Sequence, residues 1–388
     1  MTLTLKLGRL TRCALAAGLL MAAAPTQAAS LTSAPFGKLA DGRAVTRYTM
    51  TARSGVRVTF MSYGGTVTDV TAPNRWGRLA PIALSFPTLR DYETQSGPSG
   101  LYFGALIGRY ANFIAGGRFT LDGHVYRLYQ NYPPNSLHGG RKGFDQRLWR
   151  VQPTATTGPS VSAQLTYTSP DGEEGYPGTL KVTVTYSLSD AGAFTIEYRA
   201  VTDKATVVAL TNHLSLNLAG VGAPAGVLEH ELTLNADRYL PTDQTQIPLG
   251  PLASVQGTPF DFRRPTPFGA RIRARNAQLA IAGGGYDQEW VLNKHGDTTS
   301  PQWAARIYEP ISGRTLECLT TEPGVLSYTA NSLRGFPTAT GGPYRPYAAF
   351  TLETQHFPDS PNHPAFPTTV LRPGQVYRST TIFRFGVR

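Results

Sequence analysis

The sequence predicts an all-β protein built as a large antiparallel β-sandwich. Residues 181–188 alternate polar and apolar side chains with a period of two, and the alternation resumes at 194–198 after a turn at 190–192, as in a hairpin. The chain contains 40 glycines and 30 prolines, which divide it into short segments. No segment beyond the N-terminal region has a sustained helical stripe. Short strands without helical crossovers favour antiparallel sheets over a parallel α/β fold.

Further strands are predicted wherever the same pattern recurs. These runs lie at residues 56–61, 119–128, 232–235, 304–308 and 315–319. No composition break, linker or short repeat divides the chain after residue 28, so we expect one β-sandwich domain over 29–388. A chain of this size buries about three-quarters of its unfolded surface, which is enough to form a stable core.

The first 28 residues have the pattern of a signal peptide. Lys6, Arg9 and Arg12 precede a run at 13–24 that is rich in alanine and leucine, and small residues follow at 26–29. The run is shorter than the roughly 20 apolar residues that span a bilayer, so a retained membrane anchor is the weaker interpretation. We expect cleavage after Ala28, export to a periplasm or the medium, and no membrane association afterwards.

Charge and cysteine content narrow the possible functions. The formal charge of +11 falls to +8 when the three basic residues of the signal peptide are removed, and the remaining basic residues are scattered. Their densest group, at 263–275, contains no run of five, so we expect a solvated basic surface and no nucleic-acid partner. Cys318 is the only cysteine after residue 28, which excludes an intramolecular disulfide in the mature chain.

Two short segments carry residues suited to acid–base chemistry. His213 lies in 211–215 (TNHLS), and Glu353 lies far away in 352–356 (LETQH). An imidazole and a carboxylate that face each other across a cleft can move two protons near neutral pH without a metal or cofactor. By themselves the two residues also fit a sheet histidine bonded to a backbone carbonyl and a surface glutamate.

Ordered motifs along nearly all of the mature chain resemble the aldose 1-epimerase (galactose mutarotase) family. The matching runs are 63–65 (YGG), 73–77 (PNRWG), 108–112 (GRYAN), 135–140 (NSLHGG), 172–178 (GEEGYPG), 258–263 (TPFDFR), 285–287 (GYD) and 321–324 (TEPG). The resemblance implies the galactose mutarotase-like supersandwich fold. It also implies interconversion of the α and β anomers of free hexoses such as galactose or glucose, with His213 as the acid and Glu353 as the base. Neither a cofactor nor a metal is expected, and no compact set of His, Cys and Asp has metal-site spacing.

The resemblance implies sugar-binding roles for further residues. Asn112, His138 and Asp287 match the family's ligands to sugar hydroxyl groups. Ser215 is added because alternate residues of a strand share a face. Structural alternatives stay open here, since His138 also fits a turn-stabilising histidine and Asp287 an Asx-turn residue.

One position departs from the family pattern. Phe113, in 111–114 (ANFI), stands where many members carry an arginine, so five hydrogen-bond donors are replaced by an apolar face. Leu326 similarly stands where some members have glutamine, and Arg109 or Arg118 could supply a replacement donor. Two alternatives to a working mutarotase of free hexoses therefore stay open. One is an exported carbohydrate-binding relative with weak or no turnover, and the other, less favoured, is a hexose-phosphate epimerase.

Overall fold

The computed structural model describes residues 2, 28–97, 100–333, 335 and 343–388, and the elements below lie in these ranges. The predicted signal peptide at 1–28 falls almost entirely outside the described residues. Across the described ranges, no helix combines the length and the apolar character needed to cross a membrane.

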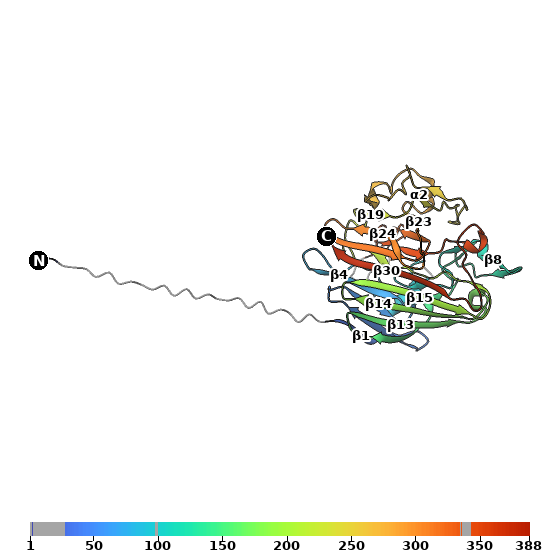
Figure 1. Cartoon of the computed structure of the whole chain (residues 1–388), viewed down its shortest axis with the longest axis horizontal. Helices are drawn as coiled ribbons and strands as arrows, with labels where there is room; N and C mark the ends of the chain where they lie inside the picture. The colour runs from blue at the N-terminus through green and yellow to red at the C-terminus, as the bar shows by residue number, and fades with distance from the viewer. Residues whose placement is uncertain (1, 3–27, 98–99, 334, 336–342) are drawn as a thin grey trace.

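A nine-stranded antiparallel sheet forms one layer of the molecule, with its long strands side by side (Figure 1). In spatial order its strands are β11 (Arg150–Ala155), β13 (Ser160–Ser169), β14 (Leu180–Ser189), β15 (Ala193–Thr202), β30 (Tyr377–Val387), β25 (Arg314–Thr320), β24 (Gln302–Tyr308), β19 (Glu231–Leu234) and β22 (Thr266–Pro267). The predicted hairpin is confirmed, because β14 and β15 pair continuously along their length. The last strand, β30, pairs with both β15 and β25 and so joins distant parts of the chain.

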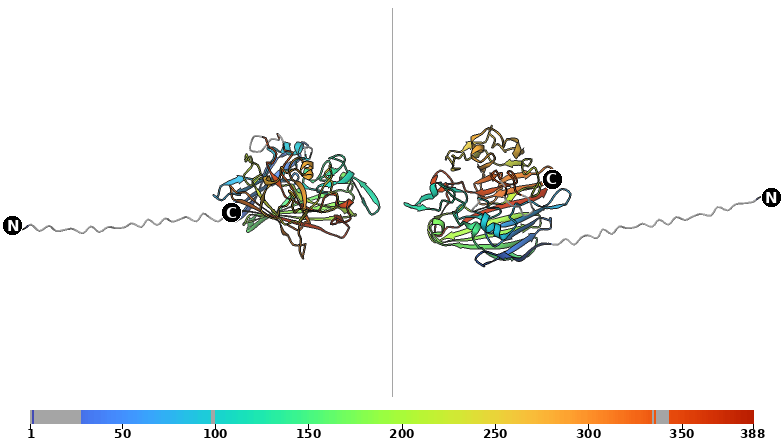
Figure 2. Two further views of the ribbon diagram at one scale, coloured as in Figure 1. Left: turned by 90° about the horizontal axis from the view of Figure 1, so that it is seen from above. Right: turned by 180° about the vertical axis from the view of Figure 1, so that it is seen from behind.

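A six-stranded antiparallel sheet, mostly from the N-terminal region, forms the second layer, and Figure 2 shows the molecule from above and from behind. Its strands are β12 (Thr157–Gly158), β1 (Ala29–Lys38), β2 (Ala44–Thr51), β3 (Arg57–Met61), β4 (Val67–Pro73) and β5 (Leu79–Pro81). Apolar side chains of the two sheets share one core. Phe60 of β3 lies edge-on against Tyr186 of β14, with ring centroids 5.1 Å apart, and both are fully buried. The predicted all-β sandwich is therefore confirmed.

Smaller sheets carry most of the residues discussed below. A five-stranded antiparallel sheet comprises β21 (Ala253–Ser254), β20 (Arg238–Tyr239), β23 (Asp287–Val291), β26 (Gly324–Tyr328) and β28 (Glu353–Gln355). Two-stranded pairs are formed by β6 (Leu106–Ile107) with β17 (Thr211–Asn212), β7 (Phe113–Ile114) with β10 (Ser136–Leu137), β8 (Arg118–Leu121) with β9 (His124–Arg127), β16 (Thr206–Val207) with β29 (Val370–Leu371), and β18 (Ser215–Leu216) with β27 (Phe350–Thr351).

The predicted strands at 56–61, 232–235, 304–308 and 315–319 coincide with β3, β19, β24 and β25. The run at 119–128 is a hairpin and not one strand, because Asp122 and Gly123 both adopt positive φ and turn the chain between β8 and β9.

Short helices went unrecognised in the sequence. These are α1 (Leu89–Gln95), which begins with a capping box between Thr88 and Asp91, and α2 (Ala277–Ile281), which is capped by Asn276. Such helices are too short to show a helical stripe. Single 3₁₀ turns lie at Ala115–Gly117, Phe144–Gln146, Glu173–Gly175, Phe268–Ala270 and Ser360–Asn362.

Candidate active site

A cleft of about 410 Å³ is lined by residues of β7, β10, β23, β26 and β28 and of the loops beside them. Five of the six residues predicted for the site lie in this lining: Asn112, His138, His213, Asp287 and Glu353. Because they come from segments as far apart as 112 and 353, the tertiary fold brings them together. The size of the cleft falls within the range of small-molecule binding sites.

His213 and Glu353 face each other in this cleft. His213 directly follows β17, and its backbone is fixed by bonds from its N–H to the Ala105 carbonyl (3.0 Å) and from the Gly104 N–H to its own carbonyl (2.9 Å). Glu353 begins β28, and the Thr351 hydroxyl donates to its Oε1 (3.1 Å). His213 Nε2 lies 3.4 Å from Glu353 Oε1. Among the described residues, His213 Nδ1 and Glu353 Oε2 have no hydrogen-bond partner.

Burial sets the protonation of this pair. It raises the pKa of Glu353 to about 8, an effect that the Thr351 hydroxyl only partly offsets, and it lowers the pKa of His213 to about 4. Between these two values the pair holds one proton, on the carboxyl group, and neither residue is charged. The pair can therefore both give and accept a proton across the physiological range.

Asn112 and His138 hold each other in place. The Asn112 backbone N–H donates to His138 Nδ1 (3.0 Å), and the His138 N–H donates to the Asn112 carbonyl (3.1 Å). Both residues have positive φ, so the turn that presents them is specific. Because Nδ1 accepts this bond, a neutral His138 carries its proton on Nε2 and acts as a donor. Asn112 Oδ1 accepts from the Phe113 N–H (2.9 Å), which leaves its Nδ2 as the group able to donate into the cleft.

Asp287 has a partner that the sequence analysis missed. Gln246 lines the cleft and donates from Nε2 to Asp287 Oδ2 (2.9 Å). Gln246 itself has a positive φ, in a turn held by the Asp243 carboxylate, which accepts from the Thr245 and Ile247 N–H groups. Burial and the nearby Glu353 raise the pKa of Asp287 to about 7, although Gln246 opposes this rise. An aspartate such as Asp243 is typical of turns, but no pattern in the sequence indicates the contact between Gln246 and Asp287.

An apolar wall completes the cleft. Phe113 and Leu326, noted above as departures from the family pattern, both line it, and the Phe113 ring lies edge-on to Tyr132 with centroids 5.3 Å apart. Neither Arg109 nor Arg118 is in the lining, so neither replaces the absent guanidinium. Arg109 is buried outside the cleft, where its guanidinium donates to the carbonyls of Pro177 and Gly178.

Ser215 is the sixth residue that was predicted for the site. It does not line the cleft, although it is only two residues beyond His213. The segment is not one continuous strand, since β17 pairs with β6 while Ser215 belongs to β18 and pairs with Thr351 of β27. The alternation of faces therefore does not carry from His213 to Ser215.

His138, His213 and Glu353 could also be considered as metal ligands, because each offers one ligand atom within 4.8 Å of the others. The bond from Asn112 occupies the Nδ1 lone pair of His138 and leaves its Nε2 protonated in the neutral ring. This tautomer suits donation to a sugar oxygen and opposes coordination by that residue.

Comparison with known proteins gives a consistent result. The family model of aldose 1-epimerase matches residues 46–384. The chain is 42% identical to galactose mutarotase from Rattus norvegicus over 359 residues, covering 92% of this chain and 99% of that protein. It is 35% identical to aldose 1-epimerase from Escherichia coli (strain K12) over 347 residues, covering 89% and 96% of the two chains. The crystal structure of galactose 1-epimerase from Lactobacillus acidophilus is similar, with a TM-score of 0.79, 25% identity and coverage of 92% and 98%.

Proposed function

Because this chain belongs to the aldose 1-epimerase family, we propose that it interconverts the α and β anomers of free aldohexoses with His213 and Glu353 as its acid–base pair. The observation that carries the residue assignment is the 3.4 Å approach of His213 Nε2 to Glu353 Oε1 within a cleft of sugar size. Each residue also has one buried polar atom without a hydrogen-bond partner among the described residues.

The proposed reaction opens and recloses the pyranose ring. His213 in its protonated form gives a proton to the ring oxygen while Glu353 removes the proton of the anomeric hydroxyl, and the bond between the anomeric carbon and the ring oxygen breaks. The resulting aldehyde rotates about its bond to the next carbon and presents its other face. Reclosure returns both protons to their donors. Each such group contributes on the order of 10²–10⁴ in rate.

The proton distribution of the pair fits one stage of this cycle. A neutral His213 beside a protonated Glu353 is the state that follows ring opening. A cyclic sugar requires the other arrangement, so its binding must move the proton from Glu353 to His213 over the 3.4 Å between them. Sugar hydroxyl groups that donate to the Glu353 carboxylate favour this transfer, since hydrogen bonds to a charged form stabilise it.

The remaining cleft residues support recognition of a neutral sugar. Asn112 Nδ2 and the His138 Nε2–H are placed to donate to sugar oxygens, and Asp287 to accept from hydroxyl groups. Phe113 provides an apolar face for ring C–H groups. Galactose and glucose are the proposed substrates, and galactose is favoured because curated relatives at 42% and 43% identity are named galactose mutarotases.

Polarimetry on freshly dissolved α-D-galactose and α-D-glucose tests the proposal. We expect the wild-type protein to accelerate relaxation of both sugars, and Glu353→Gln and His213→Asn each to lose about 10²–10⁴ of that acceleration. If all three proteins leave relaxation at the uncatalysed rate, the exported binding-protein alternative replaces catalysis. Full activity in either variant would refute the assignment of that residue.

We also propose that the protein is exported after removal of residues 1–28, on the basis of the basic and apolar pattern in that segment. Mass spectrometry of the protein recovered from a periplasmic or medium fraction is expected to show Ala29 as the first residue. An intact N-terminus on protein in the cytosol would contradict this.

A further inference from the structure

A second cavity, also about 410 Å³, lies on the solvent-facing side of the nine-stranded sheet. It is lined by residues of β13, β14, β15 and β30, and by Thr298, Thr299, Thr321, Glu322 and His356. In β14 the residues Thr183 and Thr185 face this groove, while the alternate residues Val184 and Tyr186 are buried in the core. We call this cavity the outer groove. It shares no lining residue with the active-site cleft.

Two rows of polar side chains cross the strands in the outer groove. In one row, Thr183 of β14 is paired with Arg199 of β15, which is paired with Arg378 of β30. In the adjacent row, Gln164, Thr185, Glu197 and Thr380 follow one another across β13, β14, β15 and β30. The groove thus presents hydrogen-bond donors and acceptors side by side.

The two arginines are the unusual feature. Arg199 and Arg378 are directly opposite each other in the ladder, an arrangement that is destabilising for like charges unless an anion compensates them. Among the described residues, neither guanidinium has a carboxylate within 4 Å, although Glu197 lies in the next row. Two exposed guanidinium groups with free donors form a fork suited to a carboxylate or a phosphate.

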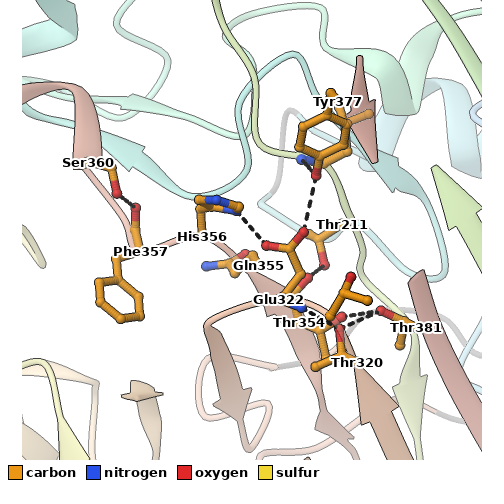
Figure 3. A network of polar contacts seen from close by, with 12 residues as sticks. Thr211, Thr320, Glu322, Thr354, Gln355, His356, Phe357, Ser360, Tyr377 and Thr381 are labelled. Atoms are coloured by element: carbon orange, nitrogen blue, oxygen red, sulfur yellow. Dashed lines mark hydrogen bonds and ion pairs between the residues drawn. The ribbon is translucent and has the colours of Figure 1, made fainter. Parts of the chain in front are cut away.

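His356 and Glu322 also line the groove, and Figure 3 shows the contact between them. Glu322 is buried, with its side chain 2% exposed, and its Oε2 accepts from His356 Nδ1 (2.6 Å) while its Oε1 accepts from the Tyr377 hydroxyl (3.3 Å). Burial lowers the pKa of His356, but the Glu322 carboxylate outweighs burial and the pKa is raised. His356 Nε2 is the ring nitrogen that Glu322 does not use, and His356 lines the groove.

We propose that the outer groove binds an anionic saccharide, meaning a sugar that bears a carboxylate or a phosphate. Arg199 and Arg378 hold the anionic group, and Glu197 with Thr183, Thr185 and Thr380 bonds the hydroxyl groups. The volume of the groove equals that of the cleft for which a hexose is proposed, so it is larger than an inorganic ion requires. Glu197 would repel a bare anion but accepts hydrogen bonds from hydroxyl groups, which favours an acidic sugar over a free oxyanion.

Isothermal titration calorimetry with D-galacturonate and D-glucose 6-phosphate tests this, with the active-site cleft first saturated with neutral D-galactose. We expect the wild-type protein to bind at least one acidic sugar, and Arg199→Ala combined with Arg378→Ala to weaken that binding at least about tenfold. Whether the carboxylated sugar, the phosphorylated sugar or both bind identifies the anionic group. The double variant is expected to relax galactose at the wild-type rate, which shows that it is folded.

Arg384→Ala is the matched control. Arg384 lies on the same strand six residues beyond Arg378, so it shares its face and is about 20 Å away, outside the groove. This variant is expected to bind the acidic sugar as the wild type does. The proposal is overturned if the double variant binds normally, if Arg384→Ala weakens binding equally, or if inorganic phosphate and acetate bind as tightly as the acidic sugars.

Discussion

Replacing Glu353 by glutamine is expected to make the protein more stable at neutral pH while removing its activity. The pKa of Glu353 is raised by burial from 4.5 to about 8. In the unfolded chain the carboxyl ionises near pH 4.5, whereas in the folded chain it stays protonated until about pH 8. Below pH 4.5 the carboxyl is protonated in both states, so it does not change the free energy of unfolding. As the pH rises from 4.5 through about 8, only the unfolded chain ionises, and the stability of the wild-type protein falls.

The size of the effect follows from this shift. The value of pH 7 lies 2.5 units above the pKa of this carboxyl in the unfolded chain. At 1.36 kcal/mol per unit, the free energy of unfolding is lowered by about 3 kcal/mol. Glutamine has the same shape, can still accept from the Thr351 hydroxyl, and does not ionise. Dividing by an unfolding entropy of about 0.75 kcal/mol/K for a chain of this length predicts a Tm increase of about 4 °C at pH 7.

The assay is thermal and urea unfolding of both proteins at pH 4.5, 7 and 8.5, together with polarimetry. We expect equal stability at pH 4.5, a growing advantage of Glu353→Gln up to pH 8, and a constant advantage above it. Glu317→Gln on β25, a half-buried glutamate paired with Arg306, is the control and is expected to change stability by less than about 0.5 kcal/mol. A variant whose advantage does not grow with pH would refute the assignment of a raised pKa to Glu353.

Further outcomes follow from the same geometry. The kcat/KM for galactose is expected to be bell-shaped in pH. It should fall below about pH 4, where His213 is protonated and the pair holds two protons, and above about pH 8, where the pair holds none. A flat profile would contradict this. Gln246→Ala removes the donor to Asp287, so KM should rise about fivefold at pH 7, with kcat changed less and with recovery at pH 8.5, where Asp287 is ionised again. Arg109→Met should lower the free energy of unfolding in urea by about 3 kcal/mol, because the buried guanidinium donates to the carbonyls of Pro177 and Gly178 (2.8 and 2.9 Å); an unchanged urea midpoint would refute this.

Local sequence patterns were sufficient to predict a strand wherever one face of that strand is buried. The alternation in β14 and β15 predicted their hairpin because a one-residue slip would expose Val184 and Tyr186 to water. The pattern was misleading at 119–128, where Asp122 and Gly123 turn the chain within an apolar run. It was also misleading at Ser215, since a change of strand partner between residues 212 and 215 interrupts the alternation.

The residues of the candidate site likewise form two groups, those that could be predicted from the sequence and those that could not. His138, His213, Asp287 and Glu353 could be predicted because their motifs resemble those of a family, and the cleft brings them together. Gln246 could not be predicted, because its contact with Asp287 depends on a turn that places residue 246 over residue 287. The outer groove was equally inaccessible, since Arg199 and Arg378 become neighbours only through the register of β15 against β30.

The sequence by itself determined the all-β class, the family and the chemical groups available for proton transfer, because these depend on residue types and on periodicity along the chain. The tertiary structure decided how those groups behave. Burial, which no local pattern records, shifts the pKa of Glu353 and of His213 in opposite directions and leaves one proton between them. Strand register, which depends on partners far apart in the chain, separates Ser215 from the cleft and places Arg199 opposite Arg378.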